Sequence, residues 1–549
     1  MKLNNRFNSV YDVCIAGSGP AGIILALEYF KLNPGKKVLL IEYGSDAGNG
    51  HNALDDSIEI TNTQNHHDPY ECTNKGFGGT SATWGGRCVM YDEIDFVKRD
   101  ILGEECTWGI ELLEDVKSFL GQSASYFECG EPVFNLNGIP AFKNTHIAEG
   151  FIEGPVTDSA IERWSMPTRF AGRYKAAIKN SPDITLVEGF ELRSLAAPDK
   201  MGIVSSAIFR DLSSNENIEV KAKVFVLAAG TQETTRILLK NKQLFNNLDG
   251  VPAALGHYYQ GHLSGKIASV RFTGDPSKTD FGFLIDSDQT YLRRRFQFTK
   301  EILQRQNLLN TAIWLDNPLY YDPKHKSGAM SFMYLAMITP ILGKKLAPPA
   351  IAHSVTKGKV TAIHKHLWNI IRQFPNSLAA PAKIFYQRYF LKRKLPGVFL
   401  FSPDNLYALH FHSEQIPVYS NRMYLKDQET LVIDYSLSEE DIISVIKVHE
   451  VLDNWLRKCG CGKLEYWFPK DKLYDAIKDM SKDGIHQSGT TRIAASPGKG
   501  VVDENLKVWG TDNVFICSSS VFPTSGQANP TFLLGAFAAR LSKYLTKEK

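Results

Sequence analysis

The chain has 549 residues, of which 43% are hydrophobic and 22% are charged, and its formal net charge is +3. This balance is typical of a globular protein and excludes a disordered or fibrous chain. The length exceeds what one hydrophobic core supports, so we expect two or more domains. Because no stretch reaches about 18 consecutive apolar residues, we expect no membrane-spanning helix.

The eight cysteines are scattered, and none forms a Cys-x-x-Cys pair. This spacing offers no zinc-binding pattern, so we expect no bound metal and free thiols in a reducing compartment. The first apolar segment leads directly into a glycine turn, so we interpret it as a β-strand and not as a signal peptide. We therefore expect a cytoplasmic protein, with peripheral contact at the inner face of the membrane as an alternative considered below.

The first elements in chain order form a βαβ pattern. Residues 11–17 predict a strand, residues 21–32 are apolar at helical spacing, and residues 36–42 predict a second buried strand. Between the first strand and the helix the chain reads GSGPAG. This order of elements is typical of a dinucleotide-binding unit, but it does not separate FAD from NAD.

The glycines of this turn have separate physical roles. Gly17 permits the tight turn, Gly19 lets a pyrophosphate approach the backbone, and Gly22 lets the helix and the strand pack closely. The N-terminus of the helix then offers free N–H groups to the phosphate. Glu42 ends the second strand, where an acid can accept hydrogen bonds from a ribose.

Two later segments extend this domain. Residues 76–96 contain GGTSATWGG, a loop whose small residues allow close approach to a planar ligand, although a surface turn has a similar composition. Strands are predicted within residues 184–195 and 220–229, and the second one ends at a glycine, Gly230, where a helix begins. We infer that the middle of the chain returns to the nucleotide-binding domain.

The C-terminal block, residues 486–545, is the most specific part of the chain. It begins with HQSGTTRIA and contains SVFPTSGQANPTF. Together with GGTSATWGG and with FHSEQIPVYSNRMYL at residues 411–425, it closely resembles the glucose-methanol-choline (GMC) oxidoreductase family, flavoenzymes that oxidise alcohols. The resemblance is weak across residues 110–180 and 265–400.

The resemblance implies that FAD is the cofactor. The loop with GGTSATWGG then lies along the flavin, and Leu192 lies where the family places an aliphatic residue against the adenine. The residues that we assign to FAD are Gly17, Gly19, Gly22, Glu42, Ser81, Trp84, Gly85, Leu192, Gly230, Ser519 and Thr531. Family members with covalent flavin carry a histidine in this loop, where this chain has Thr83, so we expect non-covalent FAD. Ser518 replaces the aspartate that commonly precedes the "xxPT" turn in the family, which puts one flavin contact in doubt.

Alcohol oxidation removes a hydroxyl proton and a carbon-bound hydride. The flavin accepts the hydride, and the protein must supply a base and a group that orients the hydroxyl. Histidine is a suitable base because its ordinary pKa lies near 6.5. The resemblance assigns the catalytic pair to His486, in H-x-x-G-T, and to Asn529, before Pro-Thr. Glu414 and Gln415 lie on a strand of the substrate domain and are candidates for substrate contact, although we favour their interpretation as ordinary polar strand residues.

The small net charge conceals a strongly basic segment. Residues 324–394 contain thirteen Lys or Arg and no Asp or Glu, so the rest of the chain is acidic. Within it, Leu367, Ile370, Ile371 and Phe374 share one face of a predicted helix. Three interpretations remain open: contact with an anionic membrane, a lid whose apolar face covers the substrate domain, or a site for a soluble anion. No nucleic-acid-binding motif accompanies the charge, so we expect no nucleic-acid partner.

We expect an α/β fold with a Rossmann-like FAD-binding domain that is built from three discontinuous segments, residues 8–105, 183–262 and 485–549. An α+β substrate domain with an antiparallel sheet and inserted helices comprises residues 106–182 and 263–484, and the basic insertion 324–394 lies within it.

The expected function is FAD-dependent oxidation of a CH–OH group to a carbonyl, as an oxidase or a dehydrogenase. We favour a sugar or glycosyl substrate, which the basic segment suggests is lipid-linked. The alternatives are a lipid or sterol-like alcohol, a redox-neutral lyase or isomerase on the same scaffold, and a non-catalytic FAD-binding module. The sequence leaves the electron acceptor open.

Overall fold

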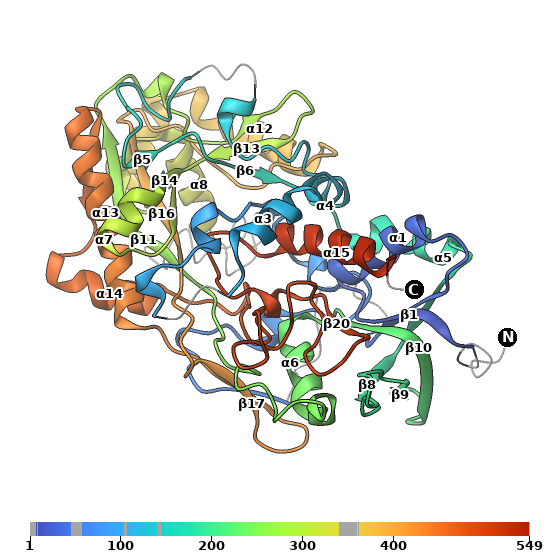
Figure 1. The fold of residues 1–549 in the computed structure, drawn as a ribbon. Helices are drawn as coiled ribbons and strands as arrows, with labels where there is room; N and C mark the ends of the chain where they lie inside the picture. Colours follow the sequence, from blue (N-terminus) through green and yellow to red (C-terminus); the bar gives the residue numbers. More distant parts are fainter. Residues whose placement is uncertain are drawn as a thin grey trace.

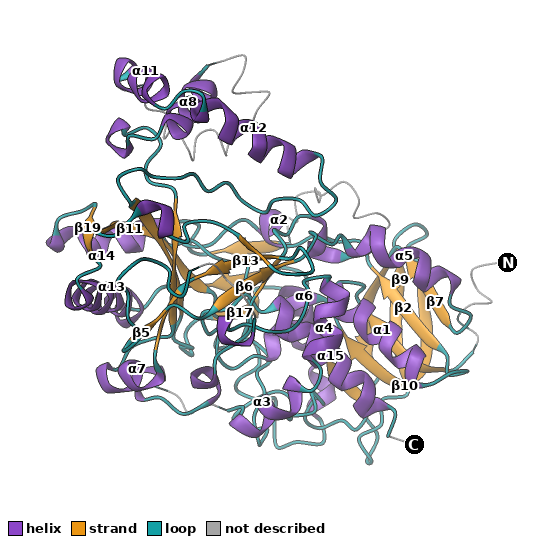
Figure 2. Ribbon diagram, turned by 90° about the horizontal axis from the view of Figure 1, so that it is seen from above, coloured by secondary structure: helices purple, strands orange, loops and turns teal. Residues whose placement is uncertain are grey.

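The computed structural model of the chain describes residues 7, 9–44, 57–103, 107–139, 144–339, 360 and 362–547. Two large sheets, each with its own hydrophobic core, organise the described residues (Figure 2). The mixed α/β fold and the antiparallel second sheet confirm the predicted fold class, while the exact domain boundaries stay a prediction.

The first sheet has the strand order β7-β2-β1-β10-β9-β8, with β20 beside β10. Its strands are β1 (Tyr11–Ala16), β2 (Val38–Glu42), β7 (Ile184–Glu188), β8 (Phe190–Leu195), β9 (Ser206–Asp211), β10 (Asn217–Leu227) and β20 (Val514–Ile516). The pairs around β1 are parallel, so that Val13 lies opposite Val38 on one side and Val224 on the other. All five residues of β2 are buried, as expected for a parallel strand that is covered on both faces.

Helices cover this sheet and begin near its carboxyl edge. The helices α1 (Pro20–Leu32) and α15 (Thr531–Leu545) pack against each other, and α4 (Leu120–Phe127) contacts α15, as Figure 1 shows. A further helix, α6 (Gly230–Lys240), follows β10 directly. Residues from the two ends and the middle of the chain therefore meet at one edge of the sheet.

The second sheet is antiparallel, with the order β19-β11-β16-β15-β14-β5. Its strands are β5 (Val156–Thr157), β11 (His262–Phe272), β14 (Phe296–Phe298), β15 (Thr311–Asp316), β16 (Leu406–Glu414) and β19 (Gly462–Tyr466). The helices α13 (Glu439–Cys459) and α14 (Leu473–Met480) accompany it. The long helix α13 begins with a capping box of Ser438 and Asp441 and ends at Gly460, whose φ of 70° suits glycine.

Smaller elements complete the described fold. A four-stranded sheet contains β4 (Arg87–Cys88), β6 (Ile161–Trp164), β12 (Leu284–Ile285) and β13 (Tyr291–Arg294), and a three-stranded sheet contains β3 (Ile58–Ile60), β17 (Arg422–Leu425) and β18 (Leu431–Asp434). The remaining α-helices among the described residues are α2 (Pro69–Cys72), α3 (Ile110–Lys117), α5 (Phe170–Asn180), α7 (Lys300–Gln306), α8 (Gly328–Ile338), α11 (Ile363–Arg372) and α12 (Asn376–Tyr389). Among the described residues, no helix combines the length and the apolar character needed to cross a bilayer.

Candidate active site

A cavity of about 560 Å³ lies where the first sheet meets the C-terminal segment. Its volume is in the range of ligand pockets. All eleven residues assigned to FAD from the sequence except Gly22 line this cavity, and so do His486 and Asn529. The structure therefore brings together residues that are separated by up to about 500 positions in the sequence.

The glycine turn after β1 has the geometry that its sequence predicts. Gly17 has a φ of 108°, and a Cβ atom at this position would collide with the backbone oxygen of Ala228. A Cβ atom on Gly22 would collide with the oxygen of Gly17, which explains why helix and strand need glycine there. A Cβ atom on Gly19, by contrast, would meet nothing within 4 Å, so this glycine leaves the cavity wall open.

Three helices begin at the cavity wall: α1, α6 and α15. Their N-terminal turns carry no hydrogen bond from a capping side chain. Each N-terminus therefore presents N–H groups and the positive end of a helix dipole. Basic side chains line the cavity near Leu192 as well, namely Lys75, Arg193, Arg236 and Lys240. This donor set fits an extended, anionic dinucleotide such as FAD.

Glu42 lies at the cavity wall, but most of its hydrogen-bonding capacity is used within the protein. One carboxylate oxygen accepts from the backbone N–H and the hydroxyl of Ser18, at 2.8 and 2.7 Å. The other accepts from the N–H groups of Gly44 and Gly76, at 3.1 and 2.9 Å. Glu42 thus connects the first glycine turn to the second glycine loop, and its contact with a ribose stays a prediction.

The second glycine loop forms the opposite wall. The Ser81 hydroxyl donates to Gly78 O at 2.6 Å and accepts from Phe170 N–H at 3.1 Å, so it holds the loop against α5. The indole N–H of Trp84 donates to Thr168 O at 3.0 Å. A Cβ atom on Gly85 would meet no atom within 4 Å, as at Gly19. The loop is therefore rigidly held by its side chains while its backbone borders open space.

The remaining assigned residues lie at the two ends of the cavity. Leu192, on β8, is on the side of the basic residues, and Gly230 has a φ of 74° at the start of α6. The Ser519 hydroxyl donates to Gln487 O at 2.8 Å, so it supports the segment after His486. Thr531 begins α15, directly after the Asn529–Pro530 pair.

His486 and Asn529 face each other at one end of the cavity. The amide nitrogen Nδ2 of Asn529 donates to Nε2 of His486 at 2.8 Å. Because Nε2 accepts this bond, the neutral ring carries its proton on Nδ1. The amide oxygen of Asn529 is buried and has no hydrogen-bond partner among the described residues. The pair therefore places an imidazole and an amide in direct contact at the cavity wall.

Asp483 supports His486, and the sequence analysis did not find it. One carboxylate oxygen accepts from the N–H groups of Gly484, Ile485 and His486, at 2.8, 2.8 and 3.2 Å. The other accepts from His262 N–H at 2.6 Å and lies 3.6 Å from Nδ1 of His486. Although burial raises the pKa of Asp483, the nearby histidines outweigh it and hold this pKa well below its ordinary value. The only local signal was an acid three residues before the histidine in a turn.

Two further histidines, His262 and His412, lie behind His486. Their rings stack at a centroid distance of 4.1 Å, and each contacts the His486 ring edge to face. His412 donates from Nδ1 to Gln527 O at 2.8 Å, and His262 donates from Nε2 to Ser525 O at 3.3 Å. Burial lowers the pKa of both residues, because it disfavours the charged form of each ring. One ring nitrogen of each of the three histidines lies within 4.8 Å of the others.

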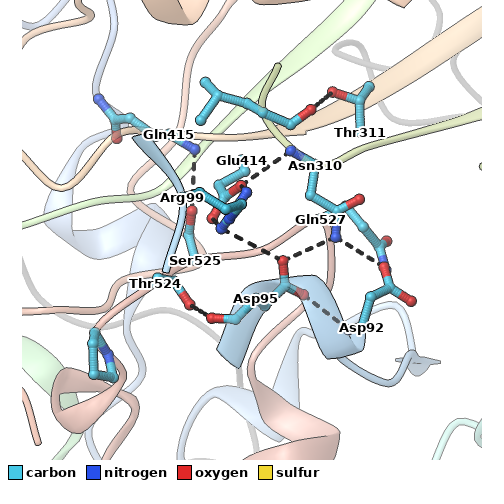
Figure 3. Close-up of polar contacts among 12 residues, drawn as sticks. Asp92, Asp95, Arg99, Asn310, Thr311, Glu414, Gln415, Thr524, Ser525 and Gln527 are labelled. Atoms are coloured by element: carbon cyan, nitrogen blue, oxygen red, sulfur yellow. Dashed lines mark hydrogen bonds and ion pairs between the residues drawn. The ribbon is translucent and has the colours of Figure 1, made fainter. Parts of the chain in front are cut away.

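The loop before Asn529 is held by a buried polar network (Figure 3). Thr524 donates to Asp95 O at 2.9 Å, and Gln527 donates to the Asp92 carboxylate at 2.9 Å. Ser525 accepts from Gln415 N–H at 3.1 Å. Each of these bonds restricts the loop, so the position of Asn529 is fixed before substrate binds.

Glu414 and Gln415 belong to this network and do not line the cavity. Glu414 is fully buried and forms two hydrogen bonds of 2.6 Å with Arg99. Gln415 is also fully buried, and its amide bonds Gly261 N–H and Ser436 O, both at 2.9 Å. The polar ends of both side chains are used within the protein, and their contact with substrate stays a prediction.

Arg87 is a cavity residue that the sequence analysis did not single out. It pairs with the buried carboxylate of Glu162 at 2.5 Å, and Arg293 and Arg295 approach the same carboxylate. Burial lowers the pKa of Arg87 to about 10, with the neighbouring arginines acting in the same direction. The cavity wall at Arg87 is therefore positively charged. The sequence did not predict this cluster, because its arginines come from β4, from β13 and from the residue after β13.

Comparisons with known proteins agree with this geometry. Residues 418–538 match the model of the GMC oxidoreductase C-terminal domain. The chain is 20% identical to the 6'''-hydroxyparomomycin C oxidase of Streptomyces lividus over 580 residues, which cover 97% of this chain and 91% of that protein.

Solved structures share the fold along the whole chain. A fungal aryl-alcohol oxidase is 15% identical with a TM-score of 0.51, and the alignment covers 98% of this chain and 99% of that one. The pyridoxine 4-oxidase of Mesorbium loti is 14% identical with a TM-score of 0.51, at 97% and 99% coverage. The family match over residues 418–538 confirms the resemblance found in the sequence: the chain is similar to FAD-dependent alcohol oxidoreductases of the glucose-methanol-choline type.

Proposed function

We propose that this protein oxidises a CH–OH group to a carbonyl with His486 as the base and Asn529 as the group that orients the hydroxyl. The observation that carries the proposal is the 2.8 Å contact between Nε2 of His486 and Nδ2 of Asn529 at the wall of the cofactor cavity. An acceptor and a donor at this separation match the two hydrogen bonds that one hydroxyl makes.

In this proposal an alcohol takes the place of the direct bond between the two side chains. Its hydroxyl donates to Nε2 of His486 and accepts from Nδ2 of Asn529. The hydroxyl proton moves to Nε2, the O–H electron pair forms the second bond of C=O, and the C–H electron pair leaves with the hydride. FAD, when bound, supplies the acceptor for the hydride that leaves the carbon. Asp483 stabilises the imidazolium, because its carboxylate lies 3.6 Å from Nδ1.

The cofactor is held without a covalent bond in this proposal. The loop position that carries a histidine in covalent flavoproteins is Thr83, which lines the cavity and accepts a hydrogen bond from Asn74 at 2.7 Å. A threonine hydroxyl is a poor nucleophile without an activating base. We expect denaturation with acid to release all of the FAD into the supernatant.

The substrate that we propose is a sugar or glycosyl hydroxyl. The likeness to an oxidase named for an aminoglycoside supports a glycosyl substrate. The basic segment 324–394 supports a lipid-linked form of it. A lipid or sterol-like alcohol is the second candidate, because exposed apolar side chains concentrate on that same segment.

Anaerobic stopped-flow absorbance tests the role of His486. We expect His486→Ala to retain FAD and to lose about 10²- to 10⁴-fold in the rate of flavin reduction by the alcohol. His364→Ala, on exposed α11 surface, is the matched control and leaves this rate unchanged. Near-normal flavin reduction in His486→Ala would remove His486 from the role of base. A screen of glycosides, solubilised glycolipids and sterols with the wild-type protein separates the candidate substrates.

A further inference from the structure

The helices α8, α11 and α12 form a lobe that stands apart from the two sheets, at the top of Figure 2. The described part of this lobe contains most of the basic segment, while Lys344, Lys345, Lys357 and Lys359 lie outside the described residues. The helix α11 is strongly amphipathic, so its orientation decides which chemical surface the lobe offers.

The polar side of α11 faces inward. His366 is buried and bonds the Ser331 hydroxyl of α8 at 3.0 Å, and Asn369 donates to the same hydroxyl at 3.1 Å. Asn369 also donates to Pro323 O at 3.0 Å. One turn later, the Gln373 side chain accepts from Gly328 N–H at 2.7 Å. These bonds fix the rotation of the helix about its axis, because turning it outward would leave buried polar groups unpaired.

The apolar side of α11 therefore faces solvent. Trp368 is 63% exposed, Ile371 is 66% exposed and Phe374 is 69% exposed. Eleven of the 24 exposed large hydrophobic side chains among the described residues lie between positions 360 and 390. We call this the apolar face of the lobe, and its members are Val360, Ile363, Leu367, Trp368, Ile371, Phe374, Leu378, Phe385, Tyr386, Tyr389 and Phe390.

This orientation corrects the interpretation of the segment as a lid. A lid would bury the side of α11 that carries Leu367 and Ile371 against the substrate domain, and the structure turns that side away. Exposed apolar side chains that are concentrated in one segment in this way mark an interaction site.

The charges beside the apolar face indicate the kind of partner. Lys365, Lys383 and Lys392 are exposed and form no ion pair with any described residue, and the same holds for Arg372 and Lys394. No acidic residue occurs anywhere in residues 324–394. The partner must therefore combine an apolar layer with a negatively charged surface.

We propose that the apolar face of the lobe docks on an anionic lipid bilayer. Its aromatic and aliphatic side chains enter the boundary between headgroups and acyl chains, and the lysines and arginines contact lipid phosphates. A second copy of the chain fits this surface less well, because pairing two such faces brings two purely basic surfaces together. The attachment is peripheral, in agreement with the finding that no described helix is suited to span a bilayer. The proposal does not depend on the identity of the alcohol.

Flotation of the FAD-loaded, full-length protein with vesicles tests the proposal. We expect binding to vesicles of phosphatidylcholine and phosphatidylserine in equal amounts at about 50 mM salt, and at least about tenfold weaker binding at about 500 mM salt. Vesicles of phosphatidylcholine alone should bind at least about tenfold less protein.

Two variants separate the apolar from the charged contribution. Trp368→Ser combined with Ile371→Ser and Phe374→Ser should reduce flotation at least about tenfold. The matched control replaces exposed apolar residues elsewhere, Ile152→Ser with Met201→Ser, which are 62% and 72% exposed, and should float like the wild type. Lys365→Gln combined with Arg372→Gln and Lys383→Gln should remove the preference for phosphatidylserine.

Three outcomes overturn the proposal. The first is no flotation at low salt, and the second is equal flotation of the face variant and its control. In the third outcome the wild-type protein does not float, and light scattering shows that it is a dimer. The triple variant of the apolar face would then be a monomer. Anaerobic flavin reduction by a soluble alcohol should be unchanged in all of these variants, so a failed membrane proposal and a failed catalytic proposal give different results.

Discussion

The loops around His486 and the lobe around α11 both use buried polar groups to fix an orientation, but they present opposite surfaces. Around the candidate active site, Asp483 and the network around Glu414 hold the loops that carry His486 and Asn529 at the cavity wall. In the lobe, His366 and Asn369 hold a helix so that its apolar side faces solvent. The comparison teaches that an amphipathic pattern gives the two sides of a helix, while the hydrogen-bond partners around it decide which side is buried.

The largest expected effect comes from breaking the network of the catalytic region. Glu414→Ala removes both 2.6 Å hydrogen bonds of the buried Arg99, which keeps the longer 4.0 Å contact with Asp95, and should lower the free energy of unfolding by about 3–5 kcal/mol. Urea unfolding at neutral pH measures this loss. The control is the exposed pair of Lys426 and Glu59, where Glu59→Ala should cost less than about 1 kcal/mol. Equal losses in both variants would show that the network contributes no special stability.

Acid should weaken the lobe. Burial and the neighbouring His366 lower the pKa of His325 to about 4, while the unfolded chain has an ordinary histidine pKa near 6.5. The folded state then keeps the ring neutral, so its stability is complete above about pH 6.5 and is lost as the pH falls towards 4. At pH 5 this one group should cost about 2 kcal/mol.

A variant of His325 isolates this effect. The ring nitrogen Nδ1 of His325 accepts from Ser327 N–H at 2.9 Å, and His325→Asn offers an amide oxygen in its place. The free energy of unfolding of this variant should change less between pH 7 and pH 5 than that of the wild type. An unchanged pH dependence would show that other groups cause the acid sensitivity.

Asp483→Asn should affect stability and turnover by similar amounts. The new amide keeps one oxygen that accepts from the N–H groups of residues 484–486. Its NH₂ group, however, would face the backbone N–H of His262, so that hydrogen bond is lost at a cost of about 1.5 kcal/mol. It also removes the negative charge beside His486. We expect flavin reduction to slow about tenfold, which corresponds to about 1.4 kcal/mol. A variant with normal reduction would limit Asp483 to a structural role in its turn.

The smallest expected effect is in the apolar face of the lobe. Ile371→Ser replaces a side chain that contacts mainly solvent, so the free energy of unfolding should change by no more than about 0.5 kcal/mol. Ile370→Ser is the adjacent comparison, at a less exposed position of the same helix, and should cost more. If Ile371→Ser proved the more destabilising variant, the apolar side of α11 would be buried in solution and the comparison would fail.

The parts of the site that lie in short motifs were predictable from the sequence. The turn with Gly17 and Gly22 follows from steric collisions within one βαβ unit, and the pairing of His486 with Asn529 follows from the family motifs that contain them. The resemblance to the GMC oxidoreductases, the fold class and FAD were predicted in the same way, and they are confirmed.

What could not be predicted depends on contacts between distant segments. Asp483 bonds His262, which is 221 positions away, and no local pattern reports this. The alternation of β16 places successive side chains on opposite faces but does not say that Glu414 meets Arg99. For α11, the sequence predicted the apolar face and left its direction open, because that direction depends on Ser331 and Pro323 in another part of the lobe.

The convergence of α1, α6 and α15 on one cavity has a consequence for how the protein matures. Three positive helix ends at the wall of one cavity repel, and an anionic cofactor reduces this repulsion when it binds. Loading with FAD and completion of the fold are then coupled, since a ligand that binds only the native chain stabilises it by mass action. The supply of FAD should therefore set how much of this protein is folded, in addition to how much of it is active.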